Sequence, residues 1–290
     1  MGTGKKGDQP PIAPTIGHTH FAATGRYFYD LTELSKAVHT GRRNFLRNGA
    51  MEVWQRGNSF SNIYNYTADR WQATRYAGTV NQITKSENNS RIADEYGFNW
   101  FLKYSFSTGG GGAAYLNQPL ESIDSKRLRG KPVCFSFYAK TSSHHAGKEF
   151  KAAISWHTNT SYNDNGMYYF NFKNATTTAM ELTFHPSELW NRYWVTTNIP
   201  YDIEQVGVAL IAKDYDEGDI DFTGCQLEIG NSPTPFEHIP YAEELALCQR
   251  YYVKVPANSY SYLPTATQTG TGTGGSNHSR VHLMWPTTMR

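Results

Sequence analysis

Short segments in which apolar residues alternate with other residues place the strongest constraint on how this chain folds. In Lys131–Lys140, the residues Val133, Phe135 and Phe137 fall on one side of an extended strand, with Cys, Ser and Tyr between them. Alternation with a period of two is typical of a half-buried β-strand. The same pattern recurs in Phe150–Trp156, Arg192–Ile199, Glu204–Ala212 and Asp219–Ile229. Several short strands separated by turn residues predict an all-β sandwich or barrel.

The last of these segments changes its alternation part-way along. Ile220 and Phe222 share one parity, whereas Leu227 has the other, and Gly224 lies at the change. A glycine inside a strand often marks a β-bulge, in which one extra residue shifts the alternation. The sequence therefore predicts a bulge at Gly224.

Composition supports the β class and excludes several functions. Of the 290 residues, 14% are aromatic and 18% are charged, which is unlike a helical bundle. The 27 Lys and Arg residues nearly balance the 25 Asp and Glu residues, so bulk charge does not indicate a nucleic-acid partner. No run of about 18 apolar residues is present, so no membrane insertion is expected. The three cysteines form no CxxC pair and predict neither a disulfide framework nor a zinc site.

The chain divides into parts of different character. Residues 1–42 are rich in Gly, Pro and Lys, and predict an extended N-terminal segment with one short helix at Asp30–Val38. Residues 43–240 hold the strand segments of the sandwich. Residues 241–252 predict a helix that links to residues 253–290, the start of a C-terminal β segment. This last part is small for an independent core, so we expect either that it packs on its neighbours or that the chain is a piece of a longer protein.

Several sequence blocks occur in a characteristic order. They are Asn44–Gly57 (NFLRNGAMEVWQRG), Thr67–Trp71 (TADRW), Gly224–Glu237 (GCQLEIG, then TPFE) and Leu245–Tyr252 (LALCQRYY). In this order, the blocks resemble a family of bacteriophage tail proteins. The resemblance implies a jelly-roll β-sandwich similar to carbohydrate-binding modules. It also implies a tail fibre or receptor-binding protein, usually a homotrimer.

The large residues in these blocks are expected to serve mainly the core. Trp54 and Trp71 lie in strand-like segments, and most aromatic residues of a sandwich fill its interior; contact with a ligand is the alternative. Arg70 is expected either to pair with Asp69 or to stack on an aromatic ring.

A His-x-His segment is the sharpest local feature of the N-terminal part. Residues i and i+2 of an extended chain point to the same side, so His18 and His20 would present their imidazoles together. In a homotrimer, three such strands would offer a set of nitrogen ligands that suits an octahedral metal such as iron. The segment also resembles the Gly-His-x-His segments with which trimeric phage tail fibres hold iron. The alternative is a pair of solvated histidines in a flexible tail.

A polar loop after one predicted strand contains candidate glycan-binding residues. They are Trp156, Tyr162, Asn163 and Asn165, whose rings and amides suit a neutral sugar. The strand parity of Trp156 favours a core position instead, and single exposed tyrosines are common.

An acidic cluster follows the segment Glu204–Ala212. It contains Asp214, Asp216, Asp219 and Asp221, and it predicts a solvated hairpin or, alternatively, a calcium site with oxygen ligands. Glycoside hydrolysis needs two positioned carboxylates, whereas these fall in one turn and the adjoining strand. No GxSxG or HExxH motif occurs. We therefore expect no enzymatic activity.

Taken with the resemblance, these features predict an adhesion protein of a phage tail. Residues 1–42 would attach to baseplate or tail proteins, and the sandwich domains of a homotrimer would bind a host surface glycan through repeated weak contacts. The expected location is the tail of the virion, acting outside the cell after release by lysis. One alternative is a structural baseplate or tail component in which the sandwich is a spacer. Another is a tail-associated polysaccharide depolymerase.

Overall fold

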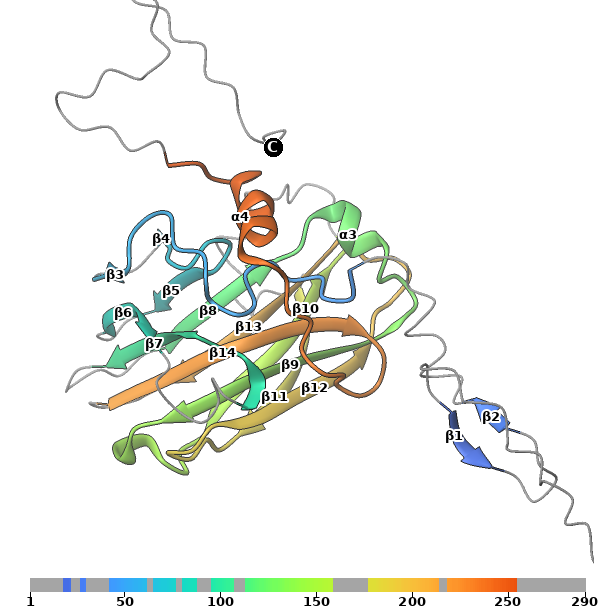
Figure 1. Ribbon diagram of the computed structural model, residues 1–290, viewed down its shortest axis with the longest axis horizontal. Coiled ribbons are helices and arrows are strands. Elements are labelled where there is room, and N and C mark those ends of the chain that lie inside the picture. Colours follow the sequence, from blue (N-terminus) through green and yellow to red (C-terminus); the bar gives the residue numbers. More distant parts are fainter. Residues whose placement is uncertain are drawn as a thin grey trace, which may run out of the picture.

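The computed structural model describes residues 18–21, 27–29, 42–61, 65–76, 80–87, 95–106, 113–158, 177–213 and 218–254. In this part of the chain, two six-stranded sheets lie face to face (Figure 1). All the strand pairs are antiparallel, and the prediction of an all-β sandwich is confirmed. No helix among the described residues is long and apolar enough to cross a membrane.

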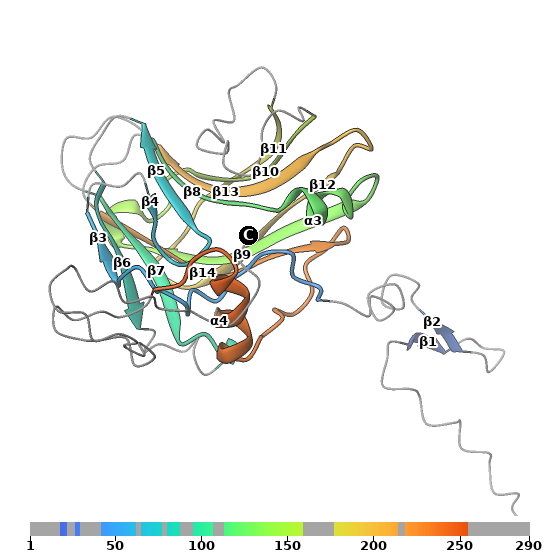
Figure 2. The ribbon, with the colours of Figure 1, turned by 90° about the horizontal axis from the view of Figure 1, so that it is seen from above.

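The first sheet has the strand order β11-β10-β13-β8-β5-β4. In Figure 2 its long strands bow toward the other sheet, so its outer face is concave, and we call it the concave sheet. Its strands are β4 (Asn65–Tyr66), β5 (Gln72–Tyr76), β8 (Ala113–Pro119), β10 (Phe150–His157), β11 (Thr177–Phe184) and β13 (Gln205–Lys213).

The second sheet has the strand order β12-β9-β14-β7-β6-β3. Its strands are β3 (Ser59–Phe60), β6 (Val80–Glu87), β7 (Trp100–Phe106), β9 (Pro132–Thr141), β12 (Asn191–Asn198) and β14 (Gly218–Ile229). The edge strands β11 and β12 contact each other, so they form adjoining edges of the two sheets, at the bottom of Figure 1.

The remaining elements are short. They are β1 (His18–Phe21), β2 (Tyr27–Tyr29), α3 (Ser122–Lys126), the 3-10 turn η1 (Ser143–His145) and α4 (Tyr241–Gln249). β1 and β2 pair with each other in an antiparallel hairpin whose register is irregular between His18 and His20.

The core lies between the two sheets and is built from the predicted inward faces. Phe135 and Phe137 are fully buried on β9, and Ile154 of β10 is buried opposite them. Phe137 meets Phe184 of β11 edge-on, with 5.1 Å between ring centroids. Burial of a side chain of this size stabilises a fold by roughly 1.5–3 kcal/mol. Trp71 is also fully buried in this core, as the sequence predicted.

The predicted bulge at Gly224 is confirmed. The register between β14 and β9 shifts between Thr223 and Gln226, and Gly224 has a φ of +59°. A Cβ atom at this glycine would lie 2.5 Å from the ring of Phe98, so only glycine fits. The bulge returns Leu227 to the core, where it is fully buried.

Some expected elements differ from the structure or lie beyond its description. The predicted helix over 241–252 ends at Gln249, and the N–H groups of Tyr251 and Tyr252 both donate to the carbonyl of Cys248. The expected helix Asp30–Val38 lies outside the described residues. The strands β5 to β8 and β11 carry weaker alternation and were not among the predicted segments.

Candidate functional site

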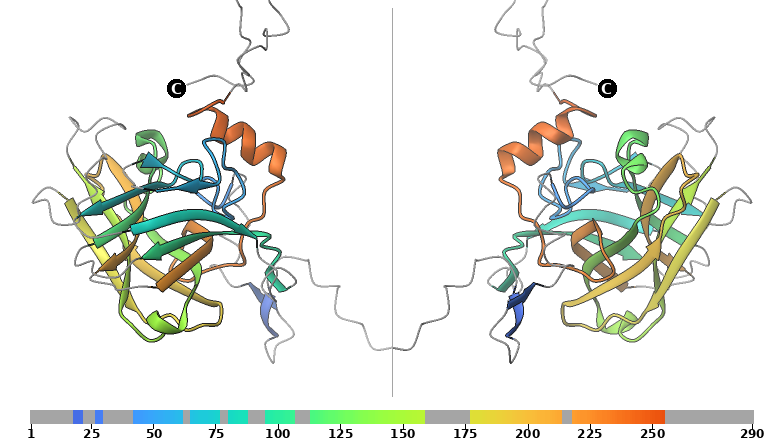
Figure 3. Two further views of the ribbon diagram at one scale, coloured as in Figure 1. Left: turned by 90° about the vertical axis from the view of Figure 1, so that its left-hand side faces the viewer. Right: turned by 90° about the vertical axis from the view of Figure 1, so that its right-hand side faces the viewer.

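The sequence blocks that are far apart along the chain meet at one end of the sandwich, beside α4 (Figure 3). We call this place the junction; it comprises residues 42–57, 67–71, 224–237 and 241–252. Asn44 accepts a hydrogen bond from the N–H of Leu227 and donates one to the carbonyl of Cys225, both at 3.1 Å. Gln55 donates to the carbonyl of Tyr252 at 2.8 Å. These bonds join the first block to the third and to the fourth.

Asn48 is the most connected residue of the junction. Its amide nitrogen donates to the carbonyls of Val53 and Asp69 at 2.8 and 3.0 Å. Its amide oxygen accepts from the N–H groups of Glu52 and Val53, both at 2.9 Å. Its own carbonyl accepts from the indole of Trp71 at 3.0 Å. Asn48 also has a φ of +55°, a conformation that asparagine tolerates better than most residues.

Two carboxylates complete the junction by accepting hydrogen bonds from the backbone. Glu244 of α4 accepts from the N–H of Asn48 at 2.6 Å, and Glu237 accepts from the N–H of Asn44 at 2.7 Å. Burial raises the pKa of Glu244 above its usual value, and the bond from Asn48 opposes this rise. The helix is therefore attached to the first block through a buried acid.

Arginine side chains hold the end of the fourth block. The guanidinium of Arg70 lies 3.8 Å from the ring centre of Tyr251, and that of Arg56 lies 3.7 Å from the ring centre of Tyr252. The stacking alternative predicted for Arg70 is therefore the one observed. Asp69 pairs instead with Arg56, at 3.5 Å.

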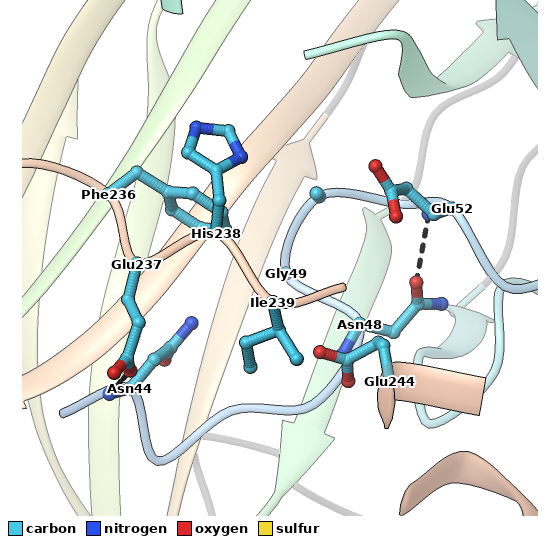
Figure 4. A pocket seen from close by; sticks show the side chains of 10 residues that line it. Asn44, Asn48, Gly49, Glu52, Phe236, Glu237, His238, Ile239 and Glu244 are labelled. Atoms are coloured by element: carbon cyan, nitrogen blue, oxygen red, sulfur yellow. Dashed lines mark hydrogen bonds between the residues drawn. The ribbon is translucent and has the colours of Figure 1, made fainter. Parts of the chain in front are cut away.

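A small pocket lies within the junction (Figure 4). Its volume is about 10 Å³, which is close to the space that one water molecule needs. It cannot hold a sugar ring. Its lining comes from residues 44–52, 236–239 and Glu244. The sequence blocks of the junction therefore hold segments of the chain together.

The outer face of the concave sheet has different chemistry. Neighbouring strands place Ala153 beside Ala209, and Ala209 beside Asn117. Gly207 lies next along β13, so the middle of this face is lined by small residues. Tyr115 packs against the alanines from β8 and supplies a flat ring at one side. These small residues are buried in the structure.

Two buried polar atoms on this face have no hydrogen-bond partner among the described residues. They are the hydroxyl of Ser155 and the amide oxygen of Asn117. Ser155 is fully buried, Asn117 is nearly so, and the Asn117 nitrogen makes only a long contact of 3.4 Å with Thr74. Buried polar atoms in native proteins are almost always paired, and an unpaired one calls for a water or a ligand.

The charged side chains that the structure describes at the β10 and β11 edge of this face are balanced. Lys151 of β10 and Glu181 of β11 form an ion pair at 3.1 Å. Among the described side chains on the strands of this face, Glu181 is the one carboxylate. Glycoside hydrolysis generally requires two carboxylates, so these side chains do not provide the usual catalytic pair.

The residues predicted to bind sugar are not brought together by the described part of the chain. Trp156 faces the core with 8% of its surface exposed, so its prediction as a glycan contact was wrong and the core alternative holds. The strand pairing that points Ser155 outward turns Trp156 inward. Tyr162, Asn163 and Asn165 lie outside the described residues.

The residues of the predicted metal sites also lie largely outside the part of the chain that the structure describes. Asp214 and Asp216 lie outside the described residues, as do the side chains of His18 and His20 on β1. No group of three or more His, Cys, Asp or Glu side chains in the described ranges could hold a metal ion.

The expectation of a solvated acidic hairpin was wrong for Asp221. This residue is 4% exposed on the outer face of the second sheet, where it pairs with Lys140 at 3.5 Å. Burial raises its pKa to about 6, although Lys103 and Lys140 oppose the rise.

Sequence comparisons identify no relative, whereas structural comparisons return sandwich domains. No protein-family model matches the chain, and no curated protein is significantly similar to it. One similar structure is the enzymatically active domain of tailspike protein 4 from bacteriophage CBA120, with 15% identity and a TM-score of 0.43. That match covers 64% of this chain and 21% of the tailspike chain.

Two other similar structures are carbohydrate-binding modules. One is in complex with β-1,4-galactotriose, with 10% identity, a TM-score of 0.39, and coverage of 65% of this chain and 100% of that one. The other is a xylan-binding domain from Paenibacillus barcinonensis, with 9% identity, a TM-score of 0.39, and coverage of 67% and 100%. Likeness at this level does not assign a ligand to this chain.

Proposed function

We propose that the outer face of the concave sheet binds an uncharged saccharide. The unpaired atoms of Ser155 and Asn117 are the observation that carries this proposal. A sugar hydroxyl both donates and accepts, so it satisfies either atom. Tyr115 offers an aromatic surface beside the small residues of this face. Because Lys151 and Glu181 neutralise each other, an uncharged ligand fits this face best.

The proposal is binding without hydrolysis, as a part of a phage tail adhesion protein. The order of the sequence blocks supports the tail assignment. In this proposal, residues 1–42 attach to baseplate or tail proteins of the virion, and the chain acts as a homotrimer on a host surface glycan. Iron at His18 and His20, and calcium at Asp214 and Asp216, are further parts of the proposal. Three weak sites in one trimer would gain avidity from their effective concentration.

Paired serine variants test the saccharide site. Ser155→Ala removes an unpaired hydroxyl on the face, whereas Ser125→Ala removes a buried hydroxyl elsewhere, which accepts from the N–H of Val206. Binding of the full chain to host cells, and to cellohexaose, xylohexaose and β-1,4-galactotriose, would be measured. We expect Ser155→Ala and Asn117→Ala to weaken binding by about tenfold, the effect of losing one good hydrogen bond. Equal binding by wild type and Ser155→Ala would contradict the proposal.

A structural tail component is a second candidate function. The junction favours it, because its sequence blocks hold segments of the chain together and the pocket that they line is too small for a sugar ring. A correctly folded full chain that binds neither host cells nor the oligosaccharides would favour this function. Release of reducing sugar from host polysaccharide would instead establish a depolymerase.

A further inference from the structure

We propose that the second sheet carries a separate site for an acidic saccharide, built on Arg192 and Trp194 of β12. This site lies on the outer face of an edge strand and is independent of the concave-sheet site. The register places Arg192 beside Tyr138 and Trp194 beside Ser136, whose side chains also face outward on β9. Trp190 directly precedes β12, and its ring lies 5.2 Å from the ammonium of Lys140 on the same face.

Arg192 carries a positive charge that no carboxylate of the described residues neutralises. One guanidinium nitrogen donates to the hydroxyl of Ser136 at 2.9 Å and to the carbonyl of Thr234 at 2.5 Å. The Nε atom of Arg192 is buried and has no acceptor in the described chain. The two nearby lysines are already paired, Lys140 with Asp221 and Lys103 with Asp219. Within the described part of the chain, the patch therefore keeps one cation that no carboxylate pairs with, and its guanidinium lies 5.6 Å from the ring centre of Tyr138.

Aromatic rings lie on either side of this cation along the strand. Trp194 is 49% exposed, although tryptophan is among the costliest side chains to leave in water. Alternate residues of a strand are about 7 Å apart, so Arg192 lies within reach of a ligand resting on Trp194. Trp190 packs edge-on against Phe101 at 5.5 Å, and its indole N–H also has no acceptor among the described residues.

These groups together define the chemistry of the ligand. A flat exposed ring suits the C–H face of a sugar, and a guanidinium suits a carboxylate through paired N–H donors. A uronic acid unit combines both features. The concave sheet, with its balanced charge, would take the uncharged part of a surface polysaccharide, and β12 would take the acidic part.

A matched pair of oligosaccharides tests this site on the full chain. The probes are a hexamer of β-1,4-linked glucuronic acid and cellohexaose, which differ only in the carboxylate at C6. Affinity would be measured by calorimetry and by tryptophan fluorescence. We expect the wild type to bind the glucuronic acid hexamer at least about tenfold more tightly than cellohexaose, and added salt to reduce this preference.

Variants of β12 test whether this strand causes the preference for the glucuronic acid hexamer. Trp194→Ala and Arg192→Gln should each weaken binding of the glucuronic acid hexamer by about tenfold. Tyr201→Ala removes another exposed ring, and Arg127→Gln removes another exposed charge, so both should bind as the wild type does. Ser155→Ala should bind the glucuronic acid hexamer with wild-type affinity, which separates this site from the proposed uncharged-saccharide site. Equal affinity for the two probes, no binding of the acidic probe, or wild-type binding by Trp194→Ala would overturn the proposal.

Discussion

The junction and the outer face of the concave sheet both bury polar side chains, but Asn48 and Glu244 of the junction are paired, whereas atoms of Ser155 and Asn117 on the sheet are not. At the junction, the side-chain amide of Asn48 makes four hydrogen bonds, and Glu244 accepts from the backbone. On the concave sheet, Ser155 and Asn117 each leave an atom without a partner in the described chain.

This difference separates two reasons for burying a polar group. A fully paired group specifies one arrangement of the chain, and its loss destabilises the fold. An unpaired buried group costs free energy, so it calls for an explanation such as a bound water or a ligand. Stability and binding measurements on the two regions should therefore respond in opposite ways.

Replacement of Asn48 by alanine should have the largest effect on stability. The variant leaves the carbonyls of Val53 and Asp69 and two backbone N–H groups unpaired in a buried place, and it retains the left-handed φ. We expect a loss of about 4 kcal/mol in the free energy of unfolding. Denaturant unfolding would measure it, and a loss below about 1 kcal/mol would show that the junction does not depend on this residue.

Asp221 should cause the next largest effect, a dependence of the free energy of unfolding on pH. Its folded pKa of about 6 lies above its ordinary value of 3.8, so the folded state holds the proton more tightly than the unfolded state. The resulting stability is present below pH 3.8 and is lost as pH rises through about 6. The shift corresponds to roughly 3 kcal/mol. Asp221→Asn should flatten this part of the stability profile.

The neighbouring Asp219 is the control for this measurement. Its side chain is 37% exposed and pairs with Lys103, so water screens its charge. Asp219→Asn should leave most of the fall in stability between pH 4 and 6 in place, and should reduce it only in part, because burial contributes more than the Asp219 charge to the raised pKa of Asp221. A wild-type profile that is flat over this range would contradict the burial argument.

Glu244 allows the charge at the junction to be separated from its hydrogen bond. Glu244→Gln keeps an acceptor for the N–H of Asn48 and removes the negative charge. Burial of the Glu244 carboxyl raises its pKa, so burial disfavours the charged form. We expect a change below about 1 kcal/mol for Gln and a loss of about 2 kcal/mol for Glu244→Ala. Thermal unfolding of both variants would compare them. Equal losses would mean that the charge, and not the acceptor, attaches α4.

Ser155→Ala should change stability least. No hydrogen bond of the described chain is lost, so the free energy of unfolding should stay within about 0.5 kcal/mol of wild type, or rise. Ser136→Ala is the matched control, because that buried hydroxyl accepts from Arg192 and its loss should cost about 1–2 kcal/mol. If Ser155→Ala proves the more destabilising of the two, its hydroxyl is structural.

Much of the fold follows from local alternation. The inward faces of β9, β10 and β13 were predicted from period two alone, and the change of parity at Gly224 located the bulge. Ser155 is outward by the same alternation, so the sequence contained a signal for it. Asn117 was missed because β8 alternates weakly, with Ala and Tyr before it and Pro at its end.

The junction and the β12 site could not be derived in this way. Asn44 and Leu227 are 183 positions apart, and no periodicity reports that their backbones are bonded. The unpaired charge of Arg192 likewise depends on which carboxylates the sheet places near it. Such facts arise from tertiary contacts, whereas alternation reports only which side of a strand a residue occupies.

The junction also determines how a pulling force would travel through the protein. Arg42 pairs with Glu243, Asn44 with Glu237, and Gln55 with Tyr252, so the chain enters and leaves the sandwich at bonded neighbours. Tension between the two ends would therefore load these contacts first and leave the strands of both sheets outside the line of force. A ligand bound at either proposed site would therefore be held until the contacts of the junction break.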